Sequence, residues 1–253
     1  MIASELSAEE WTRYARQIGP GVLTAQGQLR LHSATALVSR AGGMGGPAAL
    51  ALVTAGVGRV IIAHGGQMTS PDLNRQILGC EAVVGKSRAA HFAEYLRTMN
   101  RHVSVEAIDH EPDDAEALAL ARRASIVLSC PPTFQERLRL NWAALRAGVP
   151  LIDAAQWGMS GTVIAVDPGR TACLRCVYPQ EPEFEEQFPV VGAISMAIGA
   201  LAAMEAIKIL ACAGRPMFGR LWMIDAHEGR CSQVELRRDP DCPCCGAAAR
   251  QLP

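Results

Sequence analysis

Four cysteines in two Cys-x-x-Cys segments are the residues of this chain with the clearest chemical potential. The pairs are Cys173 with Cys176 and Cys242 with Cys245. Each spacing puts two thiolates on one side of a tight turn, and two such turns can close the tetrahedral four-sulfur site that zinc prefers in structural centres. We therefore predict one structural zinc at these four thiolates, with Cys244 as an alternative ligand to Cys245.

Disulfides or buried free thiols are the alternatives for these cysteines. The chain has nine cysteines, an odd number, and residues 1–10 are acidic without the apolar stretch of a secretory signal. A chain of 253 residues can also build a core without disulfides. We therefore expect a cytoplasmic protein with metal-bound thiolates. The remaining cysteines are expected to be small buried hydrophobic residues, namely Cys80, Cys130, Cys212 and Cys231.

The composition argues against nucleic-acid and membrane partners. A net charge of -1 and 5% aromatic residues provide neither a basic surface nor stacking platforms for nucleic acid. Residues 190–204 are uncharged and apolar, but this run is too short to cross a bilayer, and Glu205 and Lys208 follow it at once. We expect this run to be a central helix of the core, packed closely on all sides.

Apolar runs separated by turn residues predict an α/β fold. Strands are expected at residues 35–39, 59–63, 103–108, 126–129 and 151–154, with helices at 47–55, 86–99, 113–123 and 134–146. This alternation predicts a Rossmann-like, mainly parallel sheet with helices on both faces. Further strands at 162–166, 221–224 and 233–236 lack regular crossovers. We expect one domain over 1–253, with a nucleotide-binding-like half at 1–157 and an antiparallel-rich half carrying the four-cysteine zinc knuckle at 158–253.

A glycine-rich turn follows the first predicted strand. Gly42, Gly43 and Gly45 lie between that strand and a helix, where backbone N–H groups can approach a phosphate. One register begins at Gly43, while the other would begin at Arg40 and lacks its first glycine. A turn that serves only close packing is the alternative. The next strand is followed by His64, where a ribose site would have an acidic residue, so we expect an altered site.

Several motifs between about Glu5 and Gly246 carry a resemblance to a known family. They are Arg13-Tyr-Ala-Arg-Gln17, the glycine turn, Ala55-Gly-Val-Gly58, Leu73-Asn-Arg-Gln76, Val84-Gly85, Ala203-Met-Glu-Ala-Ile-Lys208 and both cysteine pairs. In these motifs the chain resembles the ThiF/MoeB family, which is related to the ubiquitin-activating enzymes. The resemblance implies a homodimer that uses ATP and magnesium to adenylate the C-terminal Gly-Gly carboxylate of a small ubiquitin-like sulfur carrier.

The resemblance also assigns catalytic roles to side chains of this sequence. Arg16 matches an arginine that reaches the neighbouring subunit's ATP site, and Arg75 matches a phosphate-binding arginine. Both could instead form ion pairs that hold a dimer interface. Asp72 stands at the position of a family asparagine, and Arg88 at that of an essential lysine. Lys86 could compensate for the missing lysine, although it should point elsewhere.

Other family positions of the nucleotide site are changed. Arg40 replaces the first glycine of the turn, and its positive charge could itself attract an anion. His64 replaces the ribose-binding aspartate, and Gly66 replaces a nearby acid. Pro132 stands where the family has its magnesium-binding aspartate, and proline offers no ligand to a hard cation. The loop over residues 179–189, in which some relatives carry a thioester cysteine, contains none.

Three functions follow from these observations. The first is an adenylyltransferase-type enzyme with a divergent ATP and magnesium site, acting on a sulfur carrier or another carboxylate. The second is a catalytically inactive family member that binds a partner, such as a pathway enzyme. The third is an NADP-dependent enzyme, in which Arg40, Arg59 and His64 would attract a 2′-phosphate. The accumulated changes at the nucleotide site predict weak binding of Mg-ATP.

Overall fold

One eight-stranded sheet organises the protein in a computed structural model that describes residues 5–182 and 189–247. The sheet order is β3-β2-β1-β4-β5-β6-β7-β8. The strands are β1 (Thr35–Ser39), β2 (Arg59–Ala63), β3 (Ser104–Ile108), β4 (Ile126–Ser129), β5 (Leu151–Trp157), β6 (Ser160–Val166), β7 (Arg220–Asp225) and β8 (Arg230–Glu235). Pairing is parallel from β3 to β5 and antiparallel from β5 to β8, so the predicted change of pattern is confirmed.

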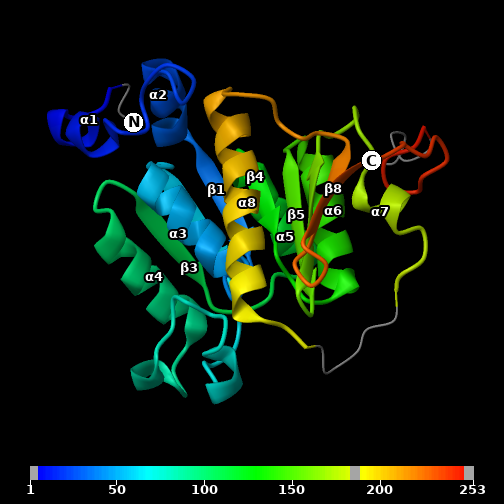
Figure 1. Ribbon diagram of the computed structural model, residues 1–253, viewed down its shortest axis with the longest axis horizontal. Coiled ribbons are helices and arrows are strands. Elements are labelled where there is room, and N and C mark those ends of the chain that lie inside the picture. The colour runs from blue at the N-terminus through cyan, green and yellow to red at the C-terminus, as the bar shows by residue number, and fades with distance from the viewer. Residues whose placement is uncertain (1–4, 183–188, 248–253) are drawn as a thin grey trace.

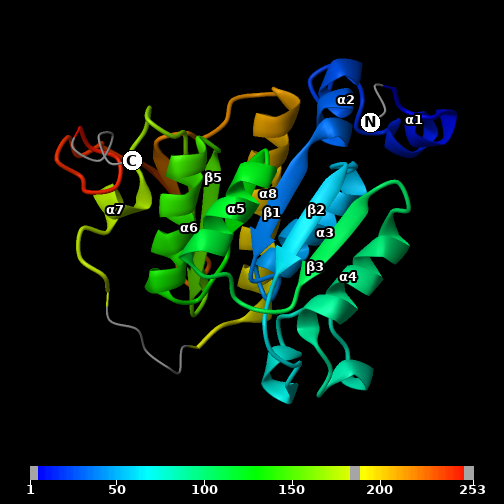
Figure 2. The same ribbon diagram turned by 180° about the vertical axis from the view of Figure 1, so that it is seen from behind.

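Helices cover both faces of this sheet, as predicted (Figures 1 and 2). The helices are α1 (Ala8–Tyr14), α2 (Ala25–Ser33), α3 (Gly45–Ala55), α4 (Arg88–Met99), α5 (Asp114–Arg123), α6 (Phe134–Ala147), α7 (Leu174–Val177) and α8 (Gly192–Ala211). Two 3-10 turns, η1 (Ser70–Asp72) and η2 (Glu81–Val83), lie between β2 and α4. Helices α3, α4 and α8 lie on one face, and α5 and α6 lie on the other.

Local capping residues set the ends of the helices near the carboxyl edge of the sheet. The Ser87 side chain accepts a hydrogen bond from the backbone of Ala90, which starts α4 two residues later than predicted. Thr133 caps α6 in the same way. Helix α3 ends at Gly56 with φ 84°, a left-handed conformation that glycine adopts at little cost. The caps at Ser87 and Thr133 fix where the turns after β2 and β4 end, and Gly56 fixes the turn that leads into β2 at the opposite edge of the sheet.

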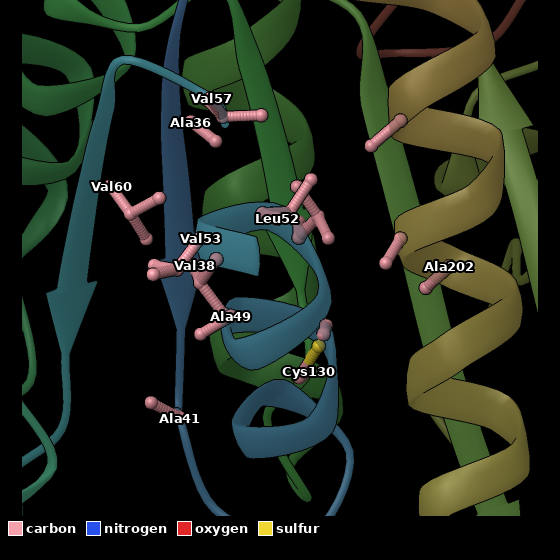
Figure 3. Close-up of a cluster of buried hydrophobic side chains, with 14 of the residues drawn as sticks. Ala36, Val38, Ala41, Ala49, Leu52, Val53, Val57, Val60, Cys130 and Ala202 are labelled. Carbon is pink, nitrogen blue, oxygen red and sulfur yellow. The ribbon is translucent and has the colours of Figure 1, made fainter. Parts of the chain in front are cut away.

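The core consists of two apolar layers, one on each face of the sheet. Alternate residues of β1 separate into them, because Ala36 and Val38 face α3 while Leu37 faces the α5 and α6 side. Figure 3 shows Val38 beside Ala49 of α3, in the layer that α8 completes. The glycine turn is therefore attached at both ends to elements that are largely buried.

Helix α8 differs from the expectation of a helix packed on all sides. Its inner residues, including Ile194, Ile198 and Ala202, are buried in the same apolar layer as α3. Met196 and Met204 on its outer side are 39% and 54% exposed. The helix has the length and apolar composition of a membrane span, but its buried face packs on α3 and the sheet. The run is a core helix as predicted, but it is not packed on all sides, because its alanines and glycines make close contacts on one face only.

Candidate functional site

A pocket of about 510 Å³ opens at the carboxyl ends of the parallel strands. It lies above β1 and β4, the neighbouring strands at which the order of the sheet reverses. Strands β2 and β3 follow on the side of β1, and β5 to β8 follow on the side of β4. Open α/β sheets bind ligands at such a switch point. Its lining on the β2 side includes Arg40, His64, Asp72, Arg75, Gln76 and Arg88. The lining on the β5 side includes Cys130, Pro132, Phe134, Arg137, Trp157 and Tyr178.

The glycine turn brings backbone close to side chains of this pocket. A Cβ atom added to Gly42 would lie 3.0 Å from Cε1 of His64, and one added to Gly43 would lie 3.3 Å from the Arg75 side chain. Both glycines are therefore needed for close approach. Arg40 has φ 57°, in the left-handed region that favours glycine. The structure thus brings Gly42 and Gly43 of the predicted turn together with His64 and Arg75, whereas Gly45 packs against Arg40 and Val38.

The Arg40 side chain does not extend as an open cation into the pocket. Its guanidinium contacts Glu111, at 2.5 Å, and Glu136, at 2.6 Å. Its Nε also donates to Glu136, over 3.2 Å. An anion that approached Arg40 would therefore have to compete with these two carboxylates for its guanidinium. Sequence reasoning missed both partners, since Glu111 follows β3 and Glu136 lies in α6, far from Arg40 in the chain.

Asp72 is the centre of a hydrogen-bond network on the β2 side. Its Oδ2 accepts from Arg88 at 2.6 Å and from the Thr69 hydroxyl at 2.5 Å. Its Oδ1 accepts from Gln76 at 2.7 Å and from Arg75 at 3.3 Å. Burial by itself would raise the pKa of Asp72, but the hydrogen bonds from Thr69 and Arg88 outweigh it and hold that pKa below its ordinary value. Asp72 is therefore a fixed anion.

His64 is a neutral group in this network. The residue is 4% exposed and its ring lies 6.0 Å from that of Phe92. Burial lowers the pKa of His64 to about 3, and the nearby charges of Arg88 and Arg40 add to this effect. At neutral pH its imidazole therefore offers one donor and one acceptor rather than the two acceptor oxygens of a carboxylate.

A buried ion pair between α6 and β5 lies next to the β5 side of the pocket. Arg137 of α6 donates to Asp153 of β5 through Nε, at 3.0 Å, and through a terminal nitrogen, at 2.5 Å. The Arg137 guanidinium also lies over the ring of Phe134, at 4.4 Å, and over that of Tyr178, at 5.4 Å. This pair was not predicted from the sequence. The available signal was Asp153 inside an apolar strand, since a buried charge requires a partner.

The pocket offers few oxygen ligands for a magnesium ion. Pro132 lines it at the predicted position, and Asp72 is the one carboxylate among the lining residues in the described part of the chain. Both oxygens of Asp72 already accept hydrogen bonds from neighbouring side chains. The nearby Cys130 is buried, and burial raises the pKa of its thiol, with Asp153 adding to the effect. It is therefore a protonated thiol in an apolar setting, not an activated nucleophile.

Four predicted residues are not among those that line the pocket, namely Gly45 of the turn, Arg16, Lys86 and Arg59. Arg16 is exposed just after α1, which packs at the amino ends of the strands through contacts such as Tyr14 with Asn100. Lys86 is exposed and is not among the lining residues. Arg59 begins β2 at the opposite edge of the sheet and pairs with Glu106. The three basic residues of the NADP hypothesis therefore do not converge. Of the loop over 179–189, residues 183–188 lie outside the described part.

The four cysteines of the Cys-x-x-Cys pairs converge beside α6. Their sulfur atoms all lie within 4.8 Å of one another. The Sγ separations are 3.7 Å for Cys173 with Cys242 and 3.4 Å for Cys176 with Cys245. Tetrahedral Zn–S bonds of about 2.3 Å would place the sulfurs roughly 3.8 Å apart, so the arrangement fits a metal such as zinc. Cys245 rather than Cys244 completes this cluster.

A comparison of the sequence with models of known protein families identifies the family to which these motifs belong. The ThiF family matches residues 14–244. The chain belongs to the ThiF family. This ThiF-family chain is 38% identical over 242 residues to the heterocyst protein HesA of Trichormus variabilis, across 95% of the chain and 91% of that relative. Membership of the ThiF/MoeB group of activating enzymes, predicted from the motifs, is thereby confirmed.

Other relatives are longer proteins. The adenylyltransferase and sulfurtransferase MOCS3 of Sus scrofa is 36% identical over 247 residues, which are 95% of this chain and 54% of MOCS3. The chain therefore spans about half of that relative. The crystal structure of E. coli MccB with ATP matches with a TM-score of 0.77 and 24% identity, over 87% of this chain and 68% of that one. This likeness concerns the fold.

Proposed function

We propose that this ThiF-family protein no longer adenylates a carboxylate with Mg-ATP and uses its pocket to bind a different ligand. The observation that carries the proposal is charge pairing within the chain. Each arginine that lines the pocket contacts a carboxylate of the same protein. The pairs are Arg40 with Glu111 and Glu136, Arg75 and Arg88 with Asp72, and Arg137 with Asp153. A triphosphate would have to compete with these carboxylates.

Two changed anchors give the size of the expected effect. The side chain of Pro132 provides no oxygen for magnesium, and the neutral His64 provides no carboxylate for a ribose. A lost hydrogen bond to a charged group costs about 1.5–3 kcal/mol, and we take a loss of at least this size for each of the two carboxylates. Two such losses weaken binding by roughly 10²-fold or more, at about 1.4 kcal/mol per factor of ten.

Calorimetric titration with Mg-ATP tests this proposal. We expect a dissociation constant in the high micromolar range, on the order of 10²-fold weaker than a low-micromolar site, or no detectable heat. A parallel assay follows exchange of labelled pyrophosphate into ATP in the presence of a small protein that ends in Gly-Gly. Low-micromolar Mg-ATP affinity together with exchange would refute the proposal.

Retained adenylation is the second candidate, and one observation favours it. Arg75 and Arg88 line the same pocket as Gly43, so two guanidinium groups remain next to the glycine turn. The relative MOCS3 is named an adenylyltransferase and sulfurtransferase, and MccB is described in complex with ATP. On this reading the substrate is a carboxylate of a small sulfur-carrier protein or peptide, and the exchange assay above would be positive.

The proposed function includes a cytoplasmic homodimer of single-domain chains, each with one structural zinc. Support for the dimer is the exposed apolar side of α8, where Met196 and Met204 face outward. Arg16 lies away from the pocket of its own chain, so any role at an active site requires a second copy. Light scattering at micromolar concentration tests the dimer. A strict monomer for the wild-type chain would remove both the dimer and the role of Arg16.

A further inference from the structure

We propose that Asp72 acts as a built-in counter-anion, which makes the polar side of the pocket select uncharged groups such as a carboxamide or the edge of a heterocyclic base. This inference rests on the proposed function, since it concerns the ligand that takes the place of Mg-ATP. It makes Asp72 a residue that determines specificity. Three independent features of the pocket carry it.

The first feature is the position of the Asp72 carboxylate between two arginines. Arg88 contacts one carboxylate oxygen at 2.6 Å and Arg75 contacts the other at 3.3 Å. Thr69 and Gln76 donate to the same two oxygens, so the carboxylate is held from several sides. Such a carboxylate occupies the place that an anionic ligand would need for its own contacts with these arginines. A negatively charged ligand group must therefore compete with Asp72 for both arginines.

The second feature is a set of polar atoms left without partners among the described residues. Nδ1 of His64, Oε1 of Gln76 and Nε of Arg88 are buried and accept or donate no hydrogen bond there. All three residues line the pocket. Gln76 donates its amide to Asp72, which leaves Oε1 as an acceptor, and Nε of Arg88 is a donor. Unpaired buried polar atoms are costly, and a ligand group with both a donor and an acceptor would complement them.

The third feature is the wall of the pocket on the β5 side. It is aromatic, and the positive charge beside it is paired with a carboxylate. Phe134 and Tyr178 meet edge to face with ring centroids 4.9 Å apart. The charge of Arg137 beside them is matched by Asp153. This wall therefore suits a planar ring without a formal charge. Together the two sides of the pocket favour a neutral ring that bears an amide-like edge.

The experiment compares benzamide with benzoate, two rings of the same size that differ in charge. Ligand-observed NMR or calorimetry measures both dissociation constants for the wild-type protein and for Asp72→Asn. We expect wild type to bind benzamide at least about tenfold more tightly than benzoate, as for one hydrogen bond to a charged group. In Asp72→Asn the arginines lose their counter-anion, so the preference should shift toward benzoate by a similar factor.

Two further variants keep this test decisive. Glu94→Gln removes one negative charge from the exposed surface of α4 and should leave the benzamide preference unchanged. Arg88→Gln removes one of the two arginines that Asp72 balances, so the preference for benzamide should rise even if Asp72→Asn fails to fold. Preference for benzoate in wild type, the same preference in all variants, or no binding of either probe would overturn the inference.

The outcome is separable from that of the proposed function. A protein that binds Mg-ATP tightly and still prefers benzamide would refute the proposed function alone. A protein that does not bind Mg-ATP but prefers benzoate would refute the role of Asp72 alone.

Discussion

Removing one partner of the buried pair of Arg137 and Asp153 should destabilise the protein strongly. Asp153 is fully buried and Arg137 nearly so, and the Ser129 hydroxyl donates to the same carboxylate at 2.9 Å. In Asp153→Asn the Arg137 charge remains in this apolar site without its anion. Removing one partner of a buried ion pair costs about 3–5 kcal/mol. We expect a loss of that size in the free energy of unfolding.

A double-mutant cycle distinguishes the pair from general disruption of the core. Arg137→Met keeps much of the length of the side chain and its packing on Phe134, but removes the charge. Combined with Asp153→Asn it leaves no uncompensated charge, so the double variant should be more stable than Asp153→Asn by about 2 kcal/mol or more. Urea unfolding followed by circular dichroism gives all four free energies.

The result that would contradict this reasoning is equally specific. If Asp153→Asn lost less than about 1 kcal/mol, the site would be more hydrated than the structure indicates. If the two single losses simply added in the double variant, the two charges would not interact. Glu94→Gln, an exposed substitution on α4, serves as the control and should change stability by less than about 0.5 kcal/mol.

Two further predictions concern the metal and the imidazole. Elemental analysis should find one zinc per chain. The variant Cys245→Ser should lose most of this zinc, whereas Cys244→Ser should keep it. Equal zinc contents in the two variants would contradict the four-ligand site. Because the folded pKa of His64 is about 3, the unfolded chain binds a proton first as pH falls below the ordinary value of 6.5. Stability should therefore drop between pH 6.5 and about pH 5 by up to about 1.4 kcal/mol per pH unit. His64→Gln should flatten this slope in urea unfolding series; an unchanged slope would show that another group causes it.

The sequence predicted those features that local patterns encode. Apolar runs in the sequence predicted the parallel strands with ends that differ from the observed ones by a few residues. Such runs are informative because the position of a buried strand depends on residues that are close together in the chain. The spacing of Cys173, Cys176, Cys242 and Cys245 predicted the cluster for the same reason, since each pair is formed by one turn. The short helices α1 and α2 were not predicted, although Ser7 and Glu10 form the capping box that starts α1 and Thr24 caps α2.

Long-range charge pairing could not be predicted from the sequence. Arg40 contacts Glu111 and Glu136 only because the ends of β1 and β3 and the start of α6 meet at one edge of the sheet. Treated alone, Arg40 suggested a cation that attracts a phosphate. The substitutions at the nucleotide site were visible in the sequence. Which of their charges pair with one another depends on the tertiary structure, as the contacts of Asp72 with Arg75 and Arg88 show.

The cysteine cluster also has a consequence for the topology of the chain. It joins the segment after β6 to the segment after β8, so a bound metal ion would enclose α8, β7 and β8 in a covalently continuous ring. A cross-link that closes a loop of about 15–100 residues is worth about 3–5 kcal/mol through the lost freedom of the unfolded chain. Thiolates bound to a metal provide this constraint in a reducing compartment, where a disulfide would be cleaved. The availability of the metal would then determine how long the antiparallel edge of the sheet resists proteolysis.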